Sequence, residues 1–284
     1  MKEYVIGGLV IGVDGEIGPR ILKLAPGEKP GKNLFGVLPG TGVETAEGFW
    51  NIYGGHRLWT APEAKPRSYS LDDSPVRVET GKEHIKIYGN MEINNAVQKE
   101  IEIKAGEKGG VEVVHRIKNT GRWRVELACW ALTVMKKGGF AILPVKRGCR
   151  QGLLPDRKLI LWPYTDLSDR RLVMDRDFIF LQQDKNTTSP CKIGVSANPS
   201  WAAYWVDGFL FTKRFAGGEG PYPDFGCSVE AYTNAEMLEL ETLGALKNLE
   251  PGNTAEHKEV WSVQEVGALS PCQDAVDKVP GVCF

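Results

Sequence analysis

Two glutamates near the end of the chain have the residue type and the spacing to move protons or to bind hydroxyl groups. Glu239 and Glu241 lie two residues apart in Met237-Leu-Glu-Leu-Glu-Thr-Leu243, whose alternation of apolar and polar residues predicts a β-strand. Side chains two residues apart on a strand point to the same face of the sheet. A solvated strand edge would explain this pair, and so would a site that handles the hydroxyls or the ring oxygen of a ligand.

A second set of reactive side chains directly follows the glycine pair Gly54-Gly55. Two glycines allow the backbone to turn tightly or to approach a ligand closely. His56 could act as a general acid or base, Arg57 could donate several hydrogen bonds, and Trp59 could stack on a sugar ring. The alternative is a turn that enters a strand, with Trp59 in the core and Arg57 in a salt bridge.

A third set lies in the segment from Trp201 to Cys227, which begins with alternating aromatic residues and ends in a loop rich in glycine and proline. The aromatic half predicts a hairpin that fills a core. Long loops on a rigid scaffold often carry binding residues, so Lys213, Tyr222 and Asp224 are candidate ligand contacts.

Short alternating segments run through the whole chain and must position these side chains. They include residues 83–88, 97–104, 111–117, 125–134, 178–181 and 208–213. No amphipathic helix of three turns interrupts them, and many strands without crossover helices predict antiparallel sheets packed face to face. We therefore expect one all-β domain over residues 1–284, with a loosely attached tail at about 267–284.

The composition is that of an ordinary globular protein, with 284 residues, 42% hydrophobic residues and a formal net charge of −1. This balance gives no reason to expect nucleic acid or an anionic membrane as a partner. The N-terminal apolar run is broken by glycines, and no segment approaches the roughly 20 apolar residues of a membrane span. The expected location is the cytoplasm, and the sequence does not indicate an oligomeric state.

Several familiar catalytic patterns are missing from the sequence. It has no Gly-x-Ser-x-Gly elbow, no phosphate-binding glycine-rich loop, no dinucleotide fingerprint and no cysteine–histidine cluster with zinc spacing. We therefore expect neither a cofactor nor a metal. Cys272 and Cys283 flank the last residues of the chain and could close that tail as a disulfide, although thiols in the cytoplasm are normally reduced.

The order of several short motifs resembles that of the galactose mutarotase-like superfamily, and the resemblance covers nearly the whole chain. The motifs are Gly12-Val-Asp-Gly-Glu-Ile-Gly-Pro-Arg-Ile-Leu-Lys-Leu24, Gly54-Gly-His-Arg-Leu-Trp59, Lys118-Asn-Thr-Gly-Arg-Trp-Arg-Val-Glu-Leu127, Val229-Glu-Ala-Tyr-Thr-Asn234, Leu240-Glu-Thr242 and Leu249-Glu-Pro-Gly252. They are similar to an uncharacterised bacterial and archaeal branch with Gly-Gly-x-Arg-Leu-Trp and Glu-x-Glu-Thr-Leu-Gly signatures. The resemblance implies an antiparallel β-supersandwich and a small-molecule carbohydrate as the ligand.

The resemblance also implies roles for single residues. In aldose epimerases a glutamate acts as base on the anomeric hydroxyl and a histidine protonates the ring oxygen. Glu241 matches the glutamate by its Leu-Glu-Thr context, with Glu239 as a hydroxyl-binding neighbour. The strand that normally carries the histidine reads Ala128-Cys-Trp-Ala-Leu-Thr-Val134 and has none. His56 would then be a displaced acid, with His115 as a weaker candidate.

Three functions remain open at this point. The first is an aldose 1-epimerase-like isomerase with Glu241 as base, His56 as acid and the other candidate residues as sugar contacts. The second is a carbohydrate-recognition domain that kept the cleft and lost the acid. The third is a carbohydrate-active lyase or hydrolase, which is disfavoured because neighbours on one strand project in parallel, whereas glycosidase carboxylates face each other across about 5–9 Å.

Overall fold

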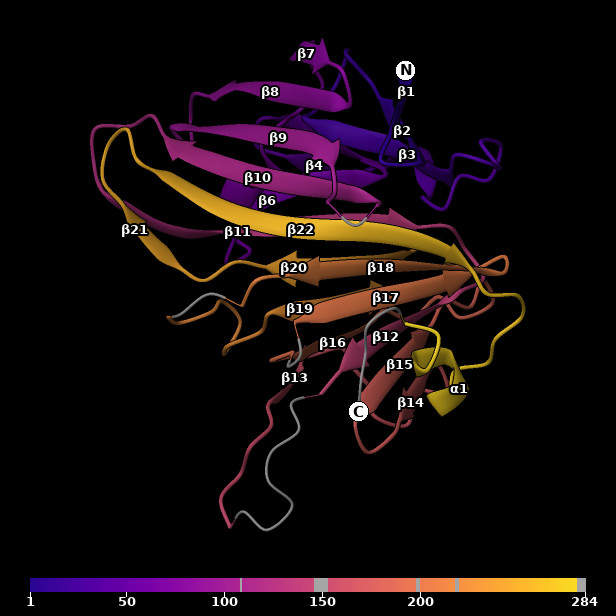
Figure 1. Cartoon of the computed structure of the whole chain (residues 1–284). Coiled ribbons are helices and arrows are strands. Elements are labelled where there is room, and N and C mark those ends of the chain that lie inside the picture. Colours follow the sequence, from indigo (N-terminus) through magenta and orange to yellow (C-terminus); the bar gives the residue numbers. More distant parts are fainter. Residues whose placement is uncertain (108, 146–152, 198–199, 218–219, 280–284) are drawn as a thin grey trace.

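The structure, a computed structural model, describes residues 1–107, 109–145, 153–197, 200–217 and 220–279. Two large sheets lie face to face, and every pairing between the named strands of these residues is antiparallel (Figure 1). The predicted all-β sandwich is confirmed. None of the described helices is long and apolar enough to cross a membrane.

The first sheet contains ten of the described strands and carries the functional candidates from the end of the chain. In spatial order these are β1 (Lys2–Ile6), β2 (Leu9–Val13), β3 (Arg20–Pro26), β6 (His56–Ala61), β11 (Val125–Met135), β20 (Leu238–Leu243), β19 (Val229–Thr233), β16 (Cys191–Val195) and β13 (Leu159–Leu161), with β21 (Lys247–Leu249) also paired to β11. Strands from both ends of the chain therefore meet at its centre, where β6, β11 and β20 lie side by side.

The second sheet also contains ten of the described strands. Its order is β14 (Leu172–Met174), β15 (Phe178–Gln182), β12 (Phe140–Pro144), β17 (Trp201–Val206), β18 (Phe209–Phe215), β22 (Thr254–Glu265), β10 (Val111–Asn119), β9 (Val97–Ala105), β8 (His84–Glu92) and β7 (Arg77–Gly81). The long strand β22 runs between β10 and β18 and joins the two halves of this sheet (Figure 1). Its alternating burial is that of a strand with one face in the core.

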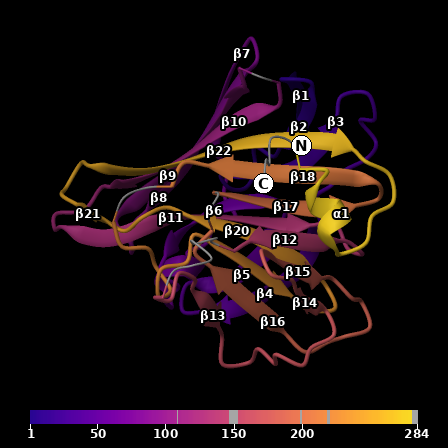
Figure 2. The same ribbon diagram turned by 60° about the horizontal axis from the view of Figure 1, so that its bottom comes forward.

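A separate hairpin of β4 (Val37–Thr45) and β5 (Gly48–Gly54) packs beside the first sheet (Figure 2). Gly54 and Gly55, with φ of +87° and +64°, connect it to β6. A Cβ atom on Gly54 would lie 2.1 Å from the carbonyl oxygen of Gly36, and one on Gly55 would lie 2.3 Å from that of Ile21. Both positions thus need glycine for conformation and for space, and this turn delivers His56 and Arg57 directly into the sheet.

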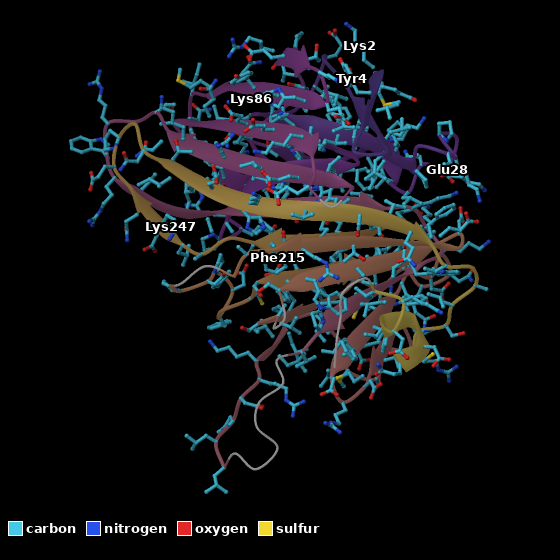
Figure 3. The ribbon with its side chains drawn as sticks, in the orientation of Figure 1. Lys2, Tyr4, Glu28, Lys86, Phe215 and Lys247 are labelled. Carbon is cyan, nitrogen blue, oxygen red and sulfur yellow. The ribbon has the colours of Figure 1, made fainter. Side chains whose placement is uncertain are left out.

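Three apolar clusters fill the layers. The largest lies between the two sheets, a second lies under the β4–β5 hairpin on the other face of the first sheet, and a third covers the outer face of the second sheet. Charged side chains such as that of Glu28 lie at the periphery (Figure 3). Because the second cluster lies under the β4–β5 hairpin, the hairpin covers part of the outer face of the first sheet.

The C-terminal segment is expected from the sequence to be a loosely attached tail. It contains a single turn of α-helix, α1 (Gln273–Val276). Ala275, Val276 and Val279 are buried in the third apolar cluster. Packing of small apolar side chains therefore fixes this segment to the second sheet as far as residue 279. Cys272 is exposed, and the disulfide that it could form with Cys283 lies outside the described residues.

Candidate functional site

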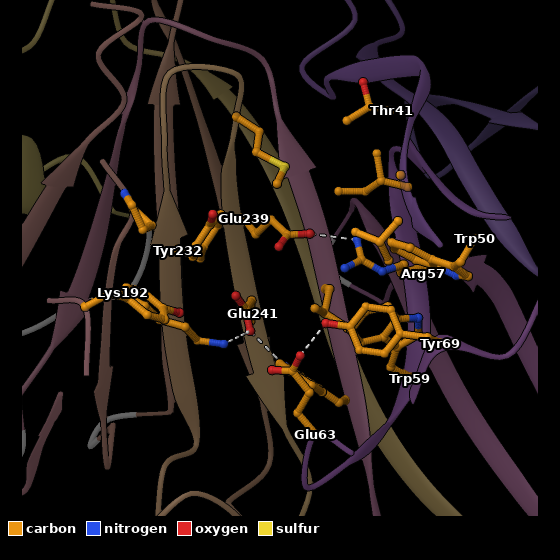
Figure 4. A pocket seen from close by; sticks show the side chains of 18 residues that line it. Thr41, Trp50, Arg57, Trp59, Glu63, Tyr69, Lys192, Tyr232, Glu239 and Glu241 are labelled. Atoms are coloured by element: carbon orange, nitrogen blue, oxygen red, sulfur yellow. Dashed lines mark hydrogen bonds and ion pairs between the residues drawn. The ribbon is translucent and has the colours of Figure 1, made fainter. Parts of the chain in front are cut away.

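A cavity of about 340 Å³ lies between the outer face of the first sheet and the β4–β5 hairpin. Its walls are largely aromatic, contributed by Trp50, Trp59, Tyr69, Trp130, Tyr164 and Tyr232. Its charged groups are Arg57, Glu63, Lys192, Glu239 and Glu241, all drawn in Figure 4. A concave, mostly apolar space with a few converging polar groups is the usual form of a small-molecule site.

Strand register explains why residues far apart in sequence meet at this cavity. Glu241 on β20 lies opposite Leu132 on β11, and Leu132 lies opposite Arg57 on β6. On the other side, Glu241 lies opposite Glu230 on β19. Residues directly opposite one another in an antiparallel pair share a face. Two residues further along these strands, a second row of opposite residues lies on the same face and consists of Val134, Glu239, Tyr232 and Lys192.

Glu241 is the central polar group of the cavity and is fully buried. Its Oε2 atom accepts hydrogen bonds from Trp130 Nε1 at 2.9 Å and from Lys192 Nζ at 3.0 Å. Burial raises the pKa of Glu241, and the nearby charge of Lys192 opposes this rise. Burial would lower the pKa of Lys192, but Glu230 and Glu241 together raise it well above its usual value, so Lys192 remains an ammonium ion.

Arg57 and Glu239 form the second charged pair of the cavity. Arg57 Nη1 lies 2.7 Å from Glu239 Oε1, and the guanidinium carbon lies 4.4 Å from the ring centroid of Trp59 and 5.4 Å from that of Trp50. Planar cations are stabilised over indole faces. Arg57 therefore covers part of the Trp59 ring that the sequence offered for sugar stacking. At the edge of the cavity, the Tyr69 hydroxyl donates a hydrogen bond to Glu63.

His56 does not reach this cavity. It lies opposite Thr133 on β11, one residue away from the row that contains Arg57, so its side chain points to the other face of the sheet. There it is fully buried between the sheets, with Nδ1 2.8 Å from Thr133 Oγ1 and its ring packed against Trp261. The structure therefore does not bring His56 and Glu241 together at one ligand, and no histidine is among the described residues that line the cavity.

The interior histidines form a hydrogen-bonded network that joins the two sheets. His115 Nδ1 lies 3.0 Å from the carbonyl oxygen of His257, so it must donate a hydrogen there. His115 Nε2 can then accept the hydrogen of His56 Nε2, which lies 2.7 Å away. Burial lowers the pKa of all three histidines, that of His257 to about 3. They are neutral at physiological pH.

The described residues with the spacing of metal ligands belong to this network. One donor atom each from His56, His115 and Glu259 lies within 4.8 Å of the other two. Two nitrogens bound to one tetrahedral zinc at about 2.0–2.1 Å would lie about 3.3 Å apart, whereas the two imidazole nitrogens are at the 2.7 Å of a hydrogen bond. Lys213 Nζ, 3.1 Å from Glu259 Oε1, already neutralises the carboxylate. We therefore interpret the cluster as hydrogen-bonded and not as a metal centre.

The three loop and hairpin candidates also lie away from the cavity wall. Lys213 is fully buried between the sheets, where it donates hydrogen bonds to the carbonyl oxygens of Ala131 on β11 and Leu240 on β20, on the face opposite to Glu241. Tyr222 is half-buried against the apolar cluster under the hairpin. Asp224, also half-buried, lies close enough to Glu230 to raise the pKa of that carboxyl group. None of the three is among the residues that line the described cavity.

Two charged residues of the site do not stand out in the sequence. Lys192 lies in Cys191-Lys-Ile-Gly-Val195 and Glu230 in Val229-Glu-Ala-Tyr-Thr233, both of which resemble apolar strands with one polar interruption. A signal for Glu230 was present in the turn at residues 234–237, which places Thr233 opposite Leu238 and hence Glu230 opposite Glu241. Lys192 has no such local signal, because its strand comes from a distant part of the chain.

Comparison with known proteins identifies the architecture. No protein-family model matches the sequence, and no curated protein is similar to it in sequence. Among solved structures, a galactose mutarotase-like protein from Lactobacillus casei ATCC 334 is similar with a TM-score of 0.61 and 9% identity over 93% of this chain and 100% of its own. A galactose mutarotase-like protein from Clostridium acetobutylicum gives a TM-score of 0.54 and 10% identity over 93% and 95%.

A TPR-domain containing protein from Parabacteroides distasonis ATCC 8503 is similar with a TM-score of 0.63 and 11% identity. That likeness covers 98% of this chain but 48% of the larger protein. All three agree over nearly the full length of this chain at sequence identities that carry information about fold alone. The chain has the galactose mutarotase-like fold.

Proposed function

We propose that the cavity binds a small carbohydrate and that Glu241 contacts the hydroxyl group at its anomeric carbon. The observation that carries this proposal is a fully buried carboxylate at the centre of an aromatic-walled cavity. The fold supports it, because similar solved structures are described as galactose mutarotase-like.

The chemistry of the cavity suits a sugar. Aromatic rings pack against the apolar C–H faces of a sugar ring, and charged side chains make strong hydrogen bonds to its hydroxyls. The volume of about 340 Å³ is near the lower end of the range for ligand pockets, which favours a small ligand. Arg57, Glu239 and Lys192 are held in place by ion pairs, so they are ordered before a ligand arrives.

Binding can be tested through the tryptophans of the wall and by calorimetry. A panel of aldoses, amino sugars, sugar acids and short oligosaccharides is titrated while tryptophan fluorescence is followed, and responding sugars are confirmed by isothermal titration calorimetry. Glu241→Gln is expected to weaken binding at least tenfold, because a charged hydrogen bond to a hydroxyl contributes about 1.5–3 kcal/mol. Glu126→Gln, an exposed change on β11, is the matched control. The absence of saturable binding across the panel would refute the proposal.

Anomer exchange is a second candidate function, favoured by the raised pKa of Glu241. In this reaction Glu241 takes the proton of the anomeric hydroxyl, the bond from C1 to the ring oxygen breaks, and the ring oxygen takes a proton from an acid. Since His56 points away, the acid would have to come from the cavity wall, where Tyr164 and Tyr232 carry hydroxyl groups. The open-chain sugar then closes to either anomer.

Exchange spectroscopy by NMR on a sugar that binds separates recognition from turnover. Exchange above the buffer rate that is lost in Glu241→Gln would establish the isomerase. Saturable binding with exchange at the buffer rate would leave a recognition domain. Cleavage by a glycosidase-type pair has less support, since Glu239 lies beside Glu241 on one strand and is bound to Arg57.

A further inference from the structure

Glu230 lies beside the proposed functional carboxylate on the neighbouring strand and has no role in the function described so far. It is opposite Glu241 in the β19–β20 pair, and both side chains are fully buried. Among the described residues, the cation in contact with both is Lys192, whose Nζ lies 2.8 Å from Glu230 Oε2 and 3.0 Å from Glu241 Oε2. Two adjacent buried carboxylates with one ammonium ion would leave a negative charge uncompensated, which is unfavourable in a low-dielectric interior.

The hydrogen-bond donors around the pair lead to the same conclusion. Donors from Trp130 and Lys192 both reach Oε2 of Glu241. Among the described residues, Oε1 of Glu241 and both oxygens of Glu230 have no strong hydrogen-bond donor, apart from the ion-pair contact of Lys192; the thiol of Cys227 is a weak donor beside Glu230. Buried oxygens without donors are costly, and a proton on one carboxyl group turns one of them into a donor for the other.

We propose that Glu230 and Glu241 share one proton at neutral pH, carried mainly by Glu230, and that Glu230 is thereby a positioning residue for Glu241. This inference rests on the proposed role of Glu241 in the carbohydrate site. Glu230 does not line the cavity, so it cannot contact the ligand itself. The hydrogen bond donated by Glu230 keeps Glu241 ionised and oriented, while the ammonium group of Lys192 contacts both carboxyl groups.

Other charged and titratable groups around the pair are consistent with this assignment. Those that interact with one or both carboxyl groups are Lys192, Asp224, Cys227, Glu239, Tyr164, Tyr232 and, from behind the sheet, Lys213. Burial raises the pKa of Glu230 well above its usual value, and Asp224 and Glu241 raise it further. The pKa of Glu241 is also raised by burial but is lowered in part by the hydrogen bond from Glu230.

A shared proton has a direct consequence for the missing histidine. An acid–base site needs a group that holds a proton near neutral pH and a group that accepts one. The carboxyl pair supplies the accepting group without any imidazole in the cavity, whereas the proton on Glu230 does not reach a ligand, so the donating group would come from the cavity wall. Glu241 therefore faces the ligand as a proton acceptor whose ionisation is set by Glu230.

Infrared difference spectroscopy tests this without any ligand. Wild type at pH 7 is expected to show the carbonyl stretch of a protonated carboxylic acid, with the small shift in D₂O that marks an exchangeable proton. The band should be lost in Glu230→Gln, whose amide keeps the shape and a hydrogen-bond donor, and retained in Glu126→Gln. In wild type alone the same band should disappear reversibly as the pH is raised, which provides a test if the variant fails to fold.

A spectrum without a protonated carboxyl at pH 7, or a band unchanged in Glu230→Gln, would overturn the shared proton. A sugar titration of the same samples keeps the two proposals separate. Sugar binding without the band would leave the carbohydrate site standing and remove the role of Glu230. The band without any sugar binding would leave the carboxyl pair standing and remove the proposed function.

Discussion

At the scale of single residues, Arg57 shows how much of the cavity depends on ion pairing. Its side chain is 3% exposed, its partner Glu239 is 9% exposed, and the guanidinium packs against two neighbouring indole rings. Removing one partner of such a pair leaves the other as an uncompensated charge away from bulk water. Substitution of either Arg57 or Glu239 alone should therefore destabilise the fold more than substitution of both together.

This ion pair gives the first prediction. Arg57→Met should lower the free energy of unfolding by about 3 kcal/mol, because Glu239 loses its cation while the apolar stem of the side chain is kept. The double variant Arg57→Met/Glu239→Gln should recover much of the loss, since neither charge then remains unpaired. Urea unfolding of the wild type, both single variants and the double variant gives the coupling energy. A double variant as unstable as the sum of the two single variants would assign the loss to packing.

At the scale of elements, the β4–β5 hairpin covers the cavity without being part of either large sheet. Arg20 on β3 holds it in place: this fully buried side chain donates to the carbonyl oxygens of Ile52 at 2.8 Å and Gly54 at 3.4 Å, and its Nε atom lies 2.7 Å from Asp72 Oδ2. The position of the cavity roof therefore depends on one guanidinium group below it.

Arg20→Met should accordingly loosen the hairpin. We expect faster amide hydrogen exchange in Gly48–Gly54, a loss of about 2–3 kcal/mol in the free energy of unfolding and weaker binding of any cavity ligand, because buried carbonyl groups lose their donors. Lys23→Met on the same strand removes a surface ion pair with Glu3 and should change the free energy of unfolding by less than about 1 kcal/mol. Equal exchange rates in Gly48–Gly54 for both variants would contradict this role of Arg20.

The burial pattern of a strand also determines whether its position and the orientation of its side chains can be predicted from sequence. Strand β9 alternates between buried and more exposed residues from Val97 to Lys104, so its position follows from sequence. β6 is buried at every position, so the sequence contains no alternation to show which of His56 and Arg57 faces the cavity. The face shared by Glu239 and Glu241 was predictable from spacing alone. The presence of Lys192 at the site could not be predicted from the sequence, because it depends on which distant strand lies beside β19.

At the scale of the whole molecule, the two sheets are joined by a buried polar network as well as by apolar packing. The first sheet contributes His56, Thr133 and Thr242, and the second contributes His115, Lys213, His257, Glu259 and Trp261. Thr242 illustrates the connection, because its hydroxyl lies 2.5 Å from Glu259 Oε1 and 2.8 Å from His257 Nε2. Separation of the sheets would expose all of these groups to water at once.

The network makes the stability of the whole fold depend on pH. Burial lowers the folded-state pKa of His56, His115 and His257, the last to about 3, so the unfolded chain binds more protons than the folded one below about pH 6.5. The stability that these three neutral histidines contribute is fully present above about pH 6.5 and is lost as the pH falls below it. Although burial raises the pKa of Glu259, the charge of Lys213 and the hydrogen bond from Thr242 help to lower it to about 2, so the stability it contributes is lost at still lower pH, below about 4.5.

Urea unfolding should therefore show a free energy of unfolding that decreases as the pH falls from about 6.5 to 5, with a limiting slope of about 1.4 kcal/mol per pH unit for each buried histidine. The proton held by the folded Glu230–Glu241 pair contributes with the opposite sign and offsets the slope of one histidine. His257→Gln should reduce the limiting slope by the contribution of one proton, because it removes one buried titrating ring while keeping a side chain that can bond Thr242. His84→Gln, on β8 outside the network, is the control and should leave the slope of the buried network unchanged. A slope that is the same in His257→Gln as in the wild type would show that the interior imidazoles do not link the two sheets to pH in this way.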